Sequence, residues 1–434
     1  MANRGQEAGL TAGQGDENTI TSQQWRWSVL AGMASYLDAG SIVALSAGLA
    51  LFQTTYHLSG GAVGALAAIG PNAIGCAIGA FVGGRLGDRL GRKRIYKYDL
   101  LIYALGILCI TFTMNPAMLF AGTFVVGLAV GADVPTSLAL VGEFSPARAR
   151  GKLLGFTQVA WNAGPVVVLV LALVLAPFGL LGIRIVFAHL CLVALVTWAL
   201  RQGLTESVRW RSASEKAGIR AVAHRYRELF RGPNLRALVW TATIYVFWNI
   251  AAGTGGIFTP YIIKTLHAGS QAASVALSCA GFVIGIIVTI WLFMPYADRS
   301  HATRRLMWGA GGMMQVLAYA AYLVFPFTIP VIIANIVLFA VGAGLAGEAF
   351  YKTFSQELFP TMLRGTAQGF TFGVARTCLG IWSFFVPILA GAGIGPVAAL
   401  LSVFLIISGA VGFFFMPDTS GKSLEHIEAE RATV

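Results

Sequence analysis

The stretch EFSPARARGKLLGFT at residues 143–157 recurs as ELFPTMLRGTAQGFT at residues 357–371. The Glu, the Pro, the Arg, two glycines, the Phe and the Thr are identical, and each pair is separated by 214 positions. A shorter repeat lies upstream, where Asp88-Arg89 recurs as Asp298-Arg299 at a spacing of 210. A repeat at so long and so constant a spacing indicates that the chain consists of two similar halves.

The composition places both halves in a membrane. Of the 434 residues, 57% are apolar or aromatic and 11% are charged, whereas a soluble domain carries about 25% charged residues. Apolar stretches of the roughly 20 residues that a membrane-spanning helix needs make up most of the chain. A soluble enzyme, a disordered protein and a secreted disulfide scaffold are therefore excluded. The five cysteines lie within apolar runs and lack the spacing of a metal site or a disulfide framework.

These stretches predict an all-α membrane protein with twelve transmembrane helices in two parallel six-helix halves. Proteins built from two such halves typically bind a solute between them. The predicted spans are residues 26–53, 61–84, 95–114, 116–142, 151–176, 179–203, 236–265, 271–295, 304–325, 327–355, 362–390 and 394–416.

The net charge of +12 predicts orientation and not nucleic-acid binding. Basic residues fill alternate gaps between the apolar stretches, and the gaps around His57 and Gly393 carry almost none. This is the positive-inside pattern of a multi-pass protein in a cell membrane, which we expect to be a bacterial inner or plasma membrane. We expect both termini and the basic linker to be cytoplasmic. The expected parts are a polar tail (1–24, without a signal peptide), the N-terminal half (25–204), the linker (205–235, helical from Ser214 to Phe230), the C-terminal half (236–416) and a second tail (417–434).

The segment GRLGDRLGRK at residues 84–93 combines glycines with charged residues. Glycine lets helices approach closely, and Asp and Arg form charge-assisted hydrogen bonds across a helix junction. The segment resembles the signature loop of the major facilitator superfamily, which implies that it latches the two halves together on the cytoplasmic face. The second copy, around Asp298-Arg299, lacks the glycines and is expected to be the weaker latch. The latch residues implied by the resemblance are Gly84, Asp88, Arg89, Gly91, Arg92, Asp298 and Arg299.

Within that superfamily, the chain is most similar to the sugar porters. Glu143 with Arg150, and Glu357 with Arg364, resemble the two Glu–Arg motifs that form part of that family's scaffold and gate. The segments 205–210 and 417–425 resemble the motifs after the sixth and twelfth spans, although the first has lost its prolines. The resemblance implies a monomeric secondary transporter, proton-coupled and without a cofactor or metal, that moves a small polar solute by alternating access.

The substrate region departs from the sugar-porter pattern. Phe247, Trp248 and Gly253 replace the Gln-Gln pair and the Asn of the seventh span, whereas Gln158 matches a family glutamine. Lys352 replaces a tryptophan, and Thr123 replaces an arginine of the fourth span. We therefore expect a polyol, a modified sugar or a sugar-like acid in place of glucose, with Lys352 available to bind a carboxylate.

Charged residues inside apolar spans are the strongest functional candidates. Such a charge costs at least about 2.5–3.5 kcal/mol, so it needs a partner or a role. Asp38 lacks an obvious countercharge nearby in sequence, and it lies where proton-coupled sugar porters carry a first-span aspartate. It is the predicted proton-coupling residue, with Asp133 as the second candidate. Glu348 and Lys352 lie four apart on one face, as a structural pair or as substrate ligands. An alternative pairing joins one aspartate to Arg376.

Aromatic and amide side chains accompany these charges and could hold a polyhydroxy solute. The predicted solute-binding residues are Asp38, Gln158, Trp161, Asn162, Trp248, Asn249, Thr254, Glu348, Lys352 and Arg376. The glycines at 253, 255 and 256 predict a break in the seventh span that would let it bend.

A membrane enzyme is disfavoured by the residue inventory. The six histidines are scattered, and the chain has no phosphate-binding loop, so neither metal chemistry nor ATP is expected. The open alternatives to sugar or polyol transport are an organic or aromatic acid symporter, a drug exporter of the same superfamily, and a nutrient sensor with the transporter fold.

Overall fold

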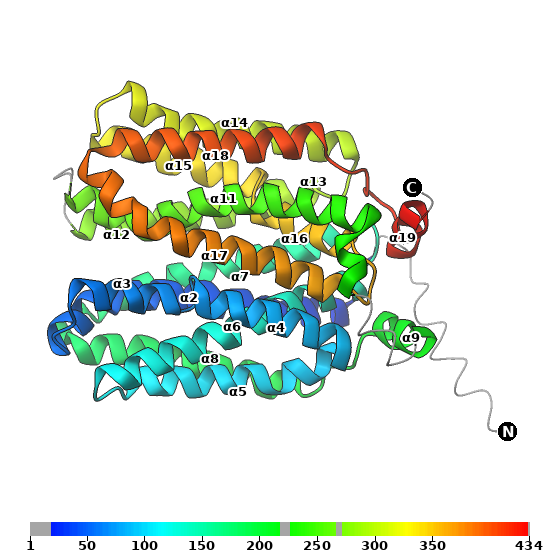
Figure 1. Cartoon of the computed structure of the whole chain (residues 1–434), viewed down its shortest axis with the longest axis horizontal. Coiled ribbons are helices and arrows are strands. Elements are labelled where there is room, and N and C mark those ends of the chain that lie inside the picture. Colours follow the sequence, from blue (N-terminus) through cyan, green and yellow to red (C-terminus); the bar gives the residue numbers. More distant parts are fainter. Residues whose placement is uncertain (1–18, 218–225, 266–270, 433–434) are drawn as a thin grey trace.

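The computed structural model describes residues 19–217, 226–265 and 271–432, and these residues form helices joined by short turns (Figure 1). Within them, six helical columns make up each half, as the sequence predicted. The N-terminal half contains α2 (Ser22–Thr55), α3 (Gly60–Ile69) with α4 (Ile74–Leu90), α5 (Arg92–Thr111), α6 (Pro116–Phe144), α7 (Arg150–Val174) and α8 (Leu180–Arg201). The C-terminal half contains α11 (Gly232–Thr265), α12 (Gln271–Val288) with α13 (Met294–Tyr296), α14 (His301–Val324), α15 (Ile329–Leu345) with α16 (Glu348–Glu357), α17 (Arg364–Gly391) and α18 (Ile394–Phe414).

The columns match the dimensions of a membrane. Among the described residues, ten helical segments are long and apolar enough to cross one. The remaining two columns, α5 and α14, carry basic residues in their first two turns. Helices suit this setting because each satisfies its own backbone hydrogen bonds where water is absent. Glycine allows the sharp turns at Gly91 (φ 96°) and Gly393 (φ 104°), which lie between consecutive columns.

Helix breaks differ from those predicted. The break expected at residues 253–256 is wrong, because α11 runs through these glycines without interruption. Instead, residues 70–73 separate α3 from α4, Ala346 and Gly347 separate α15 from α16, and α12 continues into a π-helical turn at Thr289–Phe293. The linker helix α9 (Val208–Ala217) begins earlier than expected, and a 3-10 turn covers Tyr226–Phe230. Residues 218–225 of the expected linker helix lie outside the described residues.

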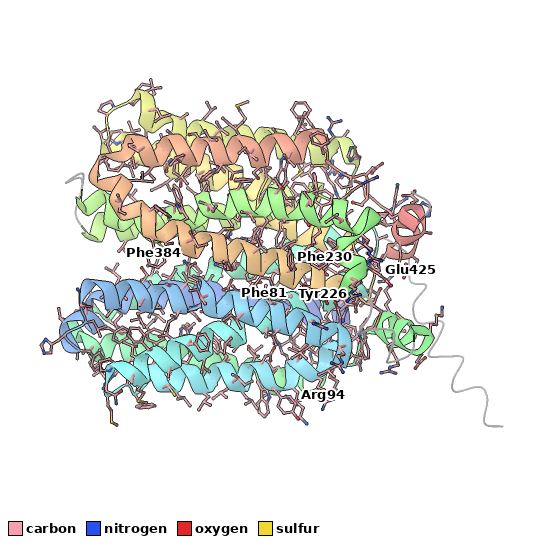
Figure 2. All side chains as sticks on the ribbon, in the orientation of Figure 1. Phe81, Arg94, Tyr226, Phe230, Phe384 and Glu425 are labelled. Atoms are coloured by element: carbon pink, nitrogen blue, oxygen red, sulfur yellow. The ribbon has the colours of Figure 1, made fainter. Side chains whose placement is uncertain are left out.

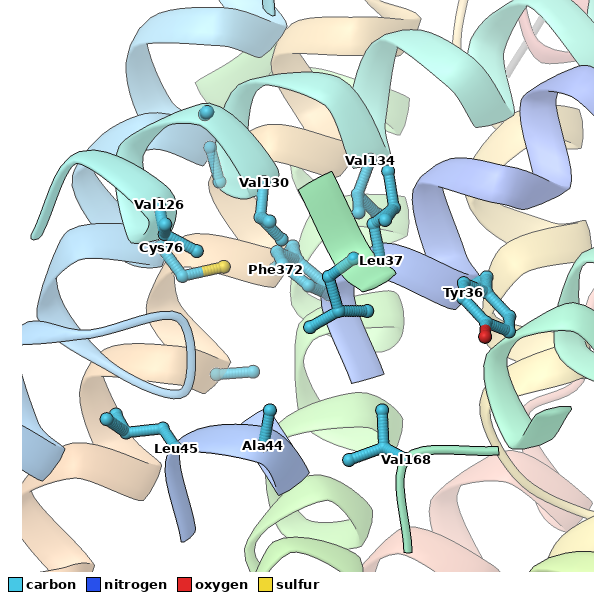
Figure 3. Close-up of a cluster of buried hydrophobic side chains, with 14 of the residues drawn as sticks. Tyr36, Leu37, Ala44, Leu45, Cys76, Val126, Val130, Val134, Val168 and Phe372 are labelled. Carbon is cyan, nitrogen blue, oxygen red and sulfur yellow. The ribbon is translucent and has the colours of Figure 1, made fainter. Parts of the chain in front are cut away.

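The two halves meet mainly along five columns. Helix α4 packs against α17, and α7 packs against α12 and α16. The helices approach closely at Gly84, where an added Cβ would lie 2.3 Å from the carbonyl oxygen of Gly365. Figure 3 shows Phe372 of α17 among buried side chains of α2 and α6, so the hydrophobic core continues from one half into the other.

One end of the bundle carries additional structure. The linker helix α9 and the C-terminal helix α19 (Leu424–Ala432) both lie there (Figure 1). Gln24 of the first turn of α2 donates to the Phe144 carbonyl at the end of α6, so α2 also starts there. Figure 2 places Arg94 and Glu425 at this end, which we call the linker end. Both ends of the described chain therefore lie on one side of the bundle, as an even number of spans requires.

Candidate functional site

Two adjoining cavities lie between the halves. The larger has a volume of about 140 Å³ and the smaller about 40 Å³, and both are lined by Trp161 of α7 and Trp248 of α11. The other aromatic residues of the larger cavity are Phe282, Tyr319 and Phe339, and its amide side chains are Gln158, Asn162 and Asn335. The smaller cavity is also lined by Asn72, Asn249, Glu348 and Arg376. An apolar wall with a few amides suits a ligand rich in hydroxyl groups.

Asp38 forms an ion pair that joins the two halves. Its Oδ2 atom lies 2.9 Å from the Nη2 of Arg376 on α17 and accepts from the Trp161 indole at 3.1 Å. Its Oδ1 atom accepts no hydrogen bond from the described residues. Asp38 has a countercharge after all, but Arg376 supplies it from 338 positions away and not from the neighbouring sequence. The alternative pairing of one aspartate with Arg376 describes the structure.

Lys352 makes a second polar contact between the halves. Its Nζ donates to Gln158 Oε1 of α7 at 2.8 Å, and it lies 3.6 Å from Glu348 Oε1 on its own helix. The side chain is 1% exposed and is not among the described residues that line the cavities. Lys352 thus already has a neutral and a charged partner, and does not present its charge to the cavities.

The remaining predicted solute residues divide into two groups. Asn162 and Asn249 line the cavities, and Trp248 lines both while donating to Gln315 at 2.7 Å. Thr254 does not line them; its hydroxyl accepts from Trp382 at 2.8 Å and donates to the Ile250 carbonyl.

Asp133, the second proton-coupling candidate, lies away from the cavity residues. It pairs with Arg201 at 3.0 Å, and Asp99 lies 3.7 Å from the same guanidinium nitrogen. All three belong to the N-terminal half, and Arg201 also donates to the Leu30 carbonyl of α2. This cluster ties α2, α5, α6 and α8 together.

Asn72 was missed by the sequence reasoning. Its Oδ1 accepts from Arg376 Nη1 at 3.2 Å, in the break between α3 and α4. The available signal was the Gly70-Pro71 pair within an apolar span, since Pro disfavours helix in the residue before it.

At the linker end, each half places a carboxylate at the start of a helix of the other half. Asp88 accepts from the backbone N–H groups of Gly365 and Thr366, at 3.0 and 2.6 Å. Asp298 accepts from the N–H groups of Gly151 and Lys152, both at 2.8 Å. Free N–H groups and the positive end of the helix dipole favour a carboxylate there. Asp298 thus accepts from two backbone N–H groups as Asp88 does, although its segment lacks the glycines of residues 84–93.

The two Glu–Arg motifs also pair across the halves. Glu143 of α6 lies 3.3 Å from Arg364 of α17, and Arg150 of α7 lies 3.1 Å from Glu357 of α16. Each glutamate has a further arginine from its own half: Arg92 lies 2.7 Å from Glu143, and Arg304 lies 2.8 Å from Glu357. All of these side chains are buried. The linker end is therefore closed by ion pairs between the halves.

Two predicted latch residues lie outside this network. Arg89 is exposed, and Arg299 is exposed with its guanidinium over the Tyr296 ring at 4.1 Å. Arg92 and Arg304 instead pair with Asp88 and Asp298, at 2.8 and 3.4 Å. Arg304 was not predicted as a site residue, although it was visible as a basic residue at the start of a span.

Gly84 and Gly91 have steric roles in the latch. Gly84 permits the contact with Gly365, and an added Cβ at Gly91 would lie 2.4 Å from Glu206 Oε2. Glu206, from the motif after the sixth span, accepts from the N–H groups of Arg92 and Lys93, both at 3.1 Å.

The linker and the C-terminal tail cover the closed end. Arg209 of α9 donates to the Glu143 carbonyl and to Glu425 of α19, the latter at 2.7 Å. Thr419 donates to Glu357 at 2.6 Å. Burial acts to raise the pKa of the Glu425 carboxyl, but Arg209 opposes it and holds that pKa below its ordinary value. Glu425 therefore stays ionised and paired at neutral pH.

We expect Asp88→Asn to weaken the closed linker end. The substitution removes the charge that Arg92 and two backbone N–H groups share, at a cost of about 1–3 kcal/mol. The protein should still reach the membrane, with a solute transport rate several-fold lower. Arg89→Gln is the matched control, because its side chain is exposed and pairs with none of the described carboxylates of the network. Equal transport by the two variants would show that Asp88 is not part of a gate.

Comparisons with known proteins agree with this geometry. Residues 28–387 match the sequence profile of the Major Facilitator Superfamily. The chain is 39% identical over 410 residues to the minor myo-inositol transporter IolF of Bacillus subtilis, with 93% of each chain covered. It is 26% identical over 368 residues to the glucose transporter GlcP of Staphylococcus epidermidis, with 78% of this chain and 82% of that relative covered.

Solved structures share the fold. The proton:xylose symporter XylE bound to 6-bromo-6-deoxy-D-glucose superposes with a TM-score of 0.78 at 18% identity, covering 94% of this chain and 98% of that one. XylE from E. coli in an inward-open conformation superposes with a TM-score of 0.66 at 18% identity, covering 93% and 98%.

Proposed function

The chain belongs to the major facilitator superfamily, and from this premise we propose that it moves a neutral cyclic polyol or sugar across the cell membrane together with a proton. It is a secondary transporter and not an enzyme. The cavity between the halves holds the solute, and alternating exposure of that cavity to the two sides moves it.

The observation that carries the proposal for a neutral solute is the pairing of the cavity charges. Arg376, the cation among the described lining residues, is already bound to Asp38 at 2.9 Å. Lys352 is bound to Gln158 and faces Glu348. A solute carboxylate would have to displace a buried carboxylate from one of these cations and leave it unpaired, which costs several kcal/mol. The hydroxyl groups of a neutral solute can instead bind the amides, and its ring can stack on Trp161 or Trp248.

The relatives support a polyol or sugar. IolF is a myo-inositol transporter and GlcP a glucose transporter by name. We propose myo-inositol, or a ring compound with a similar set of hydroxyl groups, as the solute. This choice narrows the expectation from sequence, in which Lys352 made a sugar-like acid equally acceptable.

Asp38 is the proposed proton carrier. It is 1% exposed, and its Oδ1 atom accepts no hydrogen bond from the described residues, so a proton can bind there. Its Oδ2 atom holds Arg376 of the other half, so protonation weakens a tie between the halves. The name of XylE as a proton:xylose symporter, on the same fold, supports this form of energy coupling.

The proposal is tested with the purified protein in liposomes. With the outside acidic, we expect radiolabelled myo-inositol to accumulate against its gradient and a protonophore to abolish the accumulation. Unlabelled myo-inositol and neutral sugars should compete, whereas glucuronate should compete poorly. Stronger competition by glucuronate than by neutral sugars would contradict the neutral-solute proposal. Uptake that does not depend on the pH gradient would contradict proton coupling.

We further propose that the linker end faces the cytoplasm and that the protein acts as a single chain. The support for orientation is the concentration of Lys and Arg in the linker and in the loops at this end.

The orientation gives a direct expectation. With the native cysteines replaced, a cysteine at exposed Lys216 in α9 should resist an impermeant thiol reagent in intact cells and react once the membrane is permeabilised. A cysteine at exposed Gln53, near the opposite end of α2, should react in intact cells and serves as the control. Labelling of position 216 in intact cells would contradict the proposed cytoplasmic orientation of the linker end.

A further inference from the structure

Arg376 lies between two carboxylates that belong to different halves. Asp38, on α2, holds it at 2.9 Å. Glu348, on α16 of its own half, lines the same small cavity as Arg376. If Arg376 loses Asp38, a second carboxylate therefore lines the same cavity.

Glu348 is held loosely. Its contacts with the Tyr245 hydroxyl and with Lys352 Nζ measure 3.5 and 3.6 Å. Charge-assisted hydrogen bonds are normally about 2.7–2.9 Å long, and the bond from Lys352 to Gln158 has that length at 2.8 Å. Lys352 thus makes its close bond across the interface, and Glu348 can rotate toward Arg376 without breaking a close contact of its own.

We propose that Arg376 exchanges Asp38 for Glu348 when Asp38 takes up a proton, so that an ion pair between the halves becomes an ion pair within the C-terminal half. This inference rests on the proposed proton-coupled function. Once protonated, Asp38 offers Arg376 no charge, and an unpaired buried guanidinium is costly. Glu348 supplies the missing charge, and the link between α2 and α17 opens. Glu348 acts as a positioning residue in this step.

The second link across the cavity is released by a different ligand. Gln158, which accepts from Lys352, also lines the larger cavity. Solute hydroxyls that bind the Gln158 amide compete with Lys352 for it. The proton therefore opens one link and the solute opens the other. With only one ligand bound, the other link remains and opposes movement of the halves. Coupled transport requires this of the partly loaded states.

Other ionisable groups face this charged set and bear on its pH dependence. They are the thiol of Cys76 on α4 and the phenols of Tyr103 on α5, Tyr245 on α11 and Tyr351 on α16. None of these four groups carries charge in its ordinary neutral-pH form, so the countercharge for Arg376 comes from Asp38 or Glu348.

The test measures opening of the linker end. Spin labels at exposed positions 94 and 302, which lie at the starts of α5 and α14, report the separation of the halves. The labels are attached to introduced cysteines after the five native cysteines are replaced by alanine. With myo-inositol present, the distance should increase as the pH falls, and the midpoint of this change is the readout.

The Glu348→Gln/Lys352→Met variant removes the alternative partner while it preserves the net charge. Both this variant and Lys352→Met lack the bond from Lys352 to Gln158, so the two are compared with each other. We expect the midpoint of the double variant to be more acidic than that of Lys352→Met by about one unit or more, a typical effect of a nearby carboxylate. Lys352→Met alone leaves Glu348 free for Arg376, and we expect a shift to less acidic pH. Equal midpoints in the double variant and in Lys352→Met overturn the exchange.

The single variant keeps the test decisive if the double variant fails to fold. An unchanged or more acidic midpoint in Lys352→Met also overturns the exchange. Failure of the proposed proton-coupled transport would give a different result in this experiment. If the otherwise unsubstituted labelled protein shows no opening with both myo-inositol and acid, the proposed function and the exchange are both wrong. If it opens normally and only the variants disagree, the exchange alone is wrong.

Discussion

Asp38→Asn should abolish uphill accumulation of myo-inositol in liposomes with an acidic exterior, and should leave exchange of labelled for unlabelled solute measurable. The asparagine still accepts from Trp161 and Arg376, so the cavity keeps its shape. It carries no charge and binds no proton, so the pH gradient can no longer drive transport through this residue. Accumulation should fall to the level of simple equilibration, the largest effect expected of any cavity substitution.

Asp133→Asn is the matched control for this experiment. It also removes a buried aspartate paired with an arginine, but its partner is Arg201 within the same half. We expect lower stability of the purified protein and retained accumulation by the fraction that folds. If instead Asp38→Asn accumulates solute and Asp133→Asn does not, the coupling role belongs to Asp133.

Glu357→Gln should have the largest effect on stability and gating. Glu357 is the carboxylate shared by Arg150 of the other half at 3.1 Å and Arg304 at 2.8 Å, and it also accepts from Thr419. Removing one partner of a buried ion pair costs about 3–5 kcal/mol, because the remaining charge is left uncompensated. We expect a markedly lower melting temperature in detergent and an open linker end.

Glu425→Gln provides the control at the same end of the molecule. Its pair with Arg209 is exposed, with 64% and 32% of the two side chains accessible. Exposed ion pairs contribute about 0–1 kcal/mol, so its melting temperature should remain close to that of the unsubstituted protein. Equal melting temperatures for the two variants would show that the buried network does not stabilise the closed state.

The fold was predictable because its signals are local or periodic. Apolar runs of membrane length and a repeat of 214 positions are sufficient for twelve helices in two halves. The helix breaks were not predictable from glycine content alone. Gly253, Gly255 and Gly256 lie within continuous helix, and the actual break at Gly347 lies where an added Cβ would press on Trp248.

The sequence predicted many of the site residues, but it did not predict which of them pair with each other. Glu143, Arg150, Glu357 and Arg364 all stood out, yet nothing in their spacing distinguishes pairing within a motif from pairing between the two copies. Asp38 was singled out because its neighbours in sequence offered no charge, and the reason failed because its partner lies in the other half. Contacts between the halves depend on how the two six-helix units dock, and docking leaves no periodic signal in the chain.

The reciprocal capping at the linker end has a consequence for how the duplicated halves can diverge. Asp88 binds the backbone of residues 365 and 366, and Asp298 binds that of residues 151 and 152. Each carboxylate therefore requires two free backbone N–H groups at the helix start of the opposite copy, which excludes proline there. The cavity is under no such constraint, and position 162 is Asn where its counterpart 376 is Arg. Symmetry persists where each copy is the other's binding partner, and is lost at the cavity, where the equivalent positions do not bind each other.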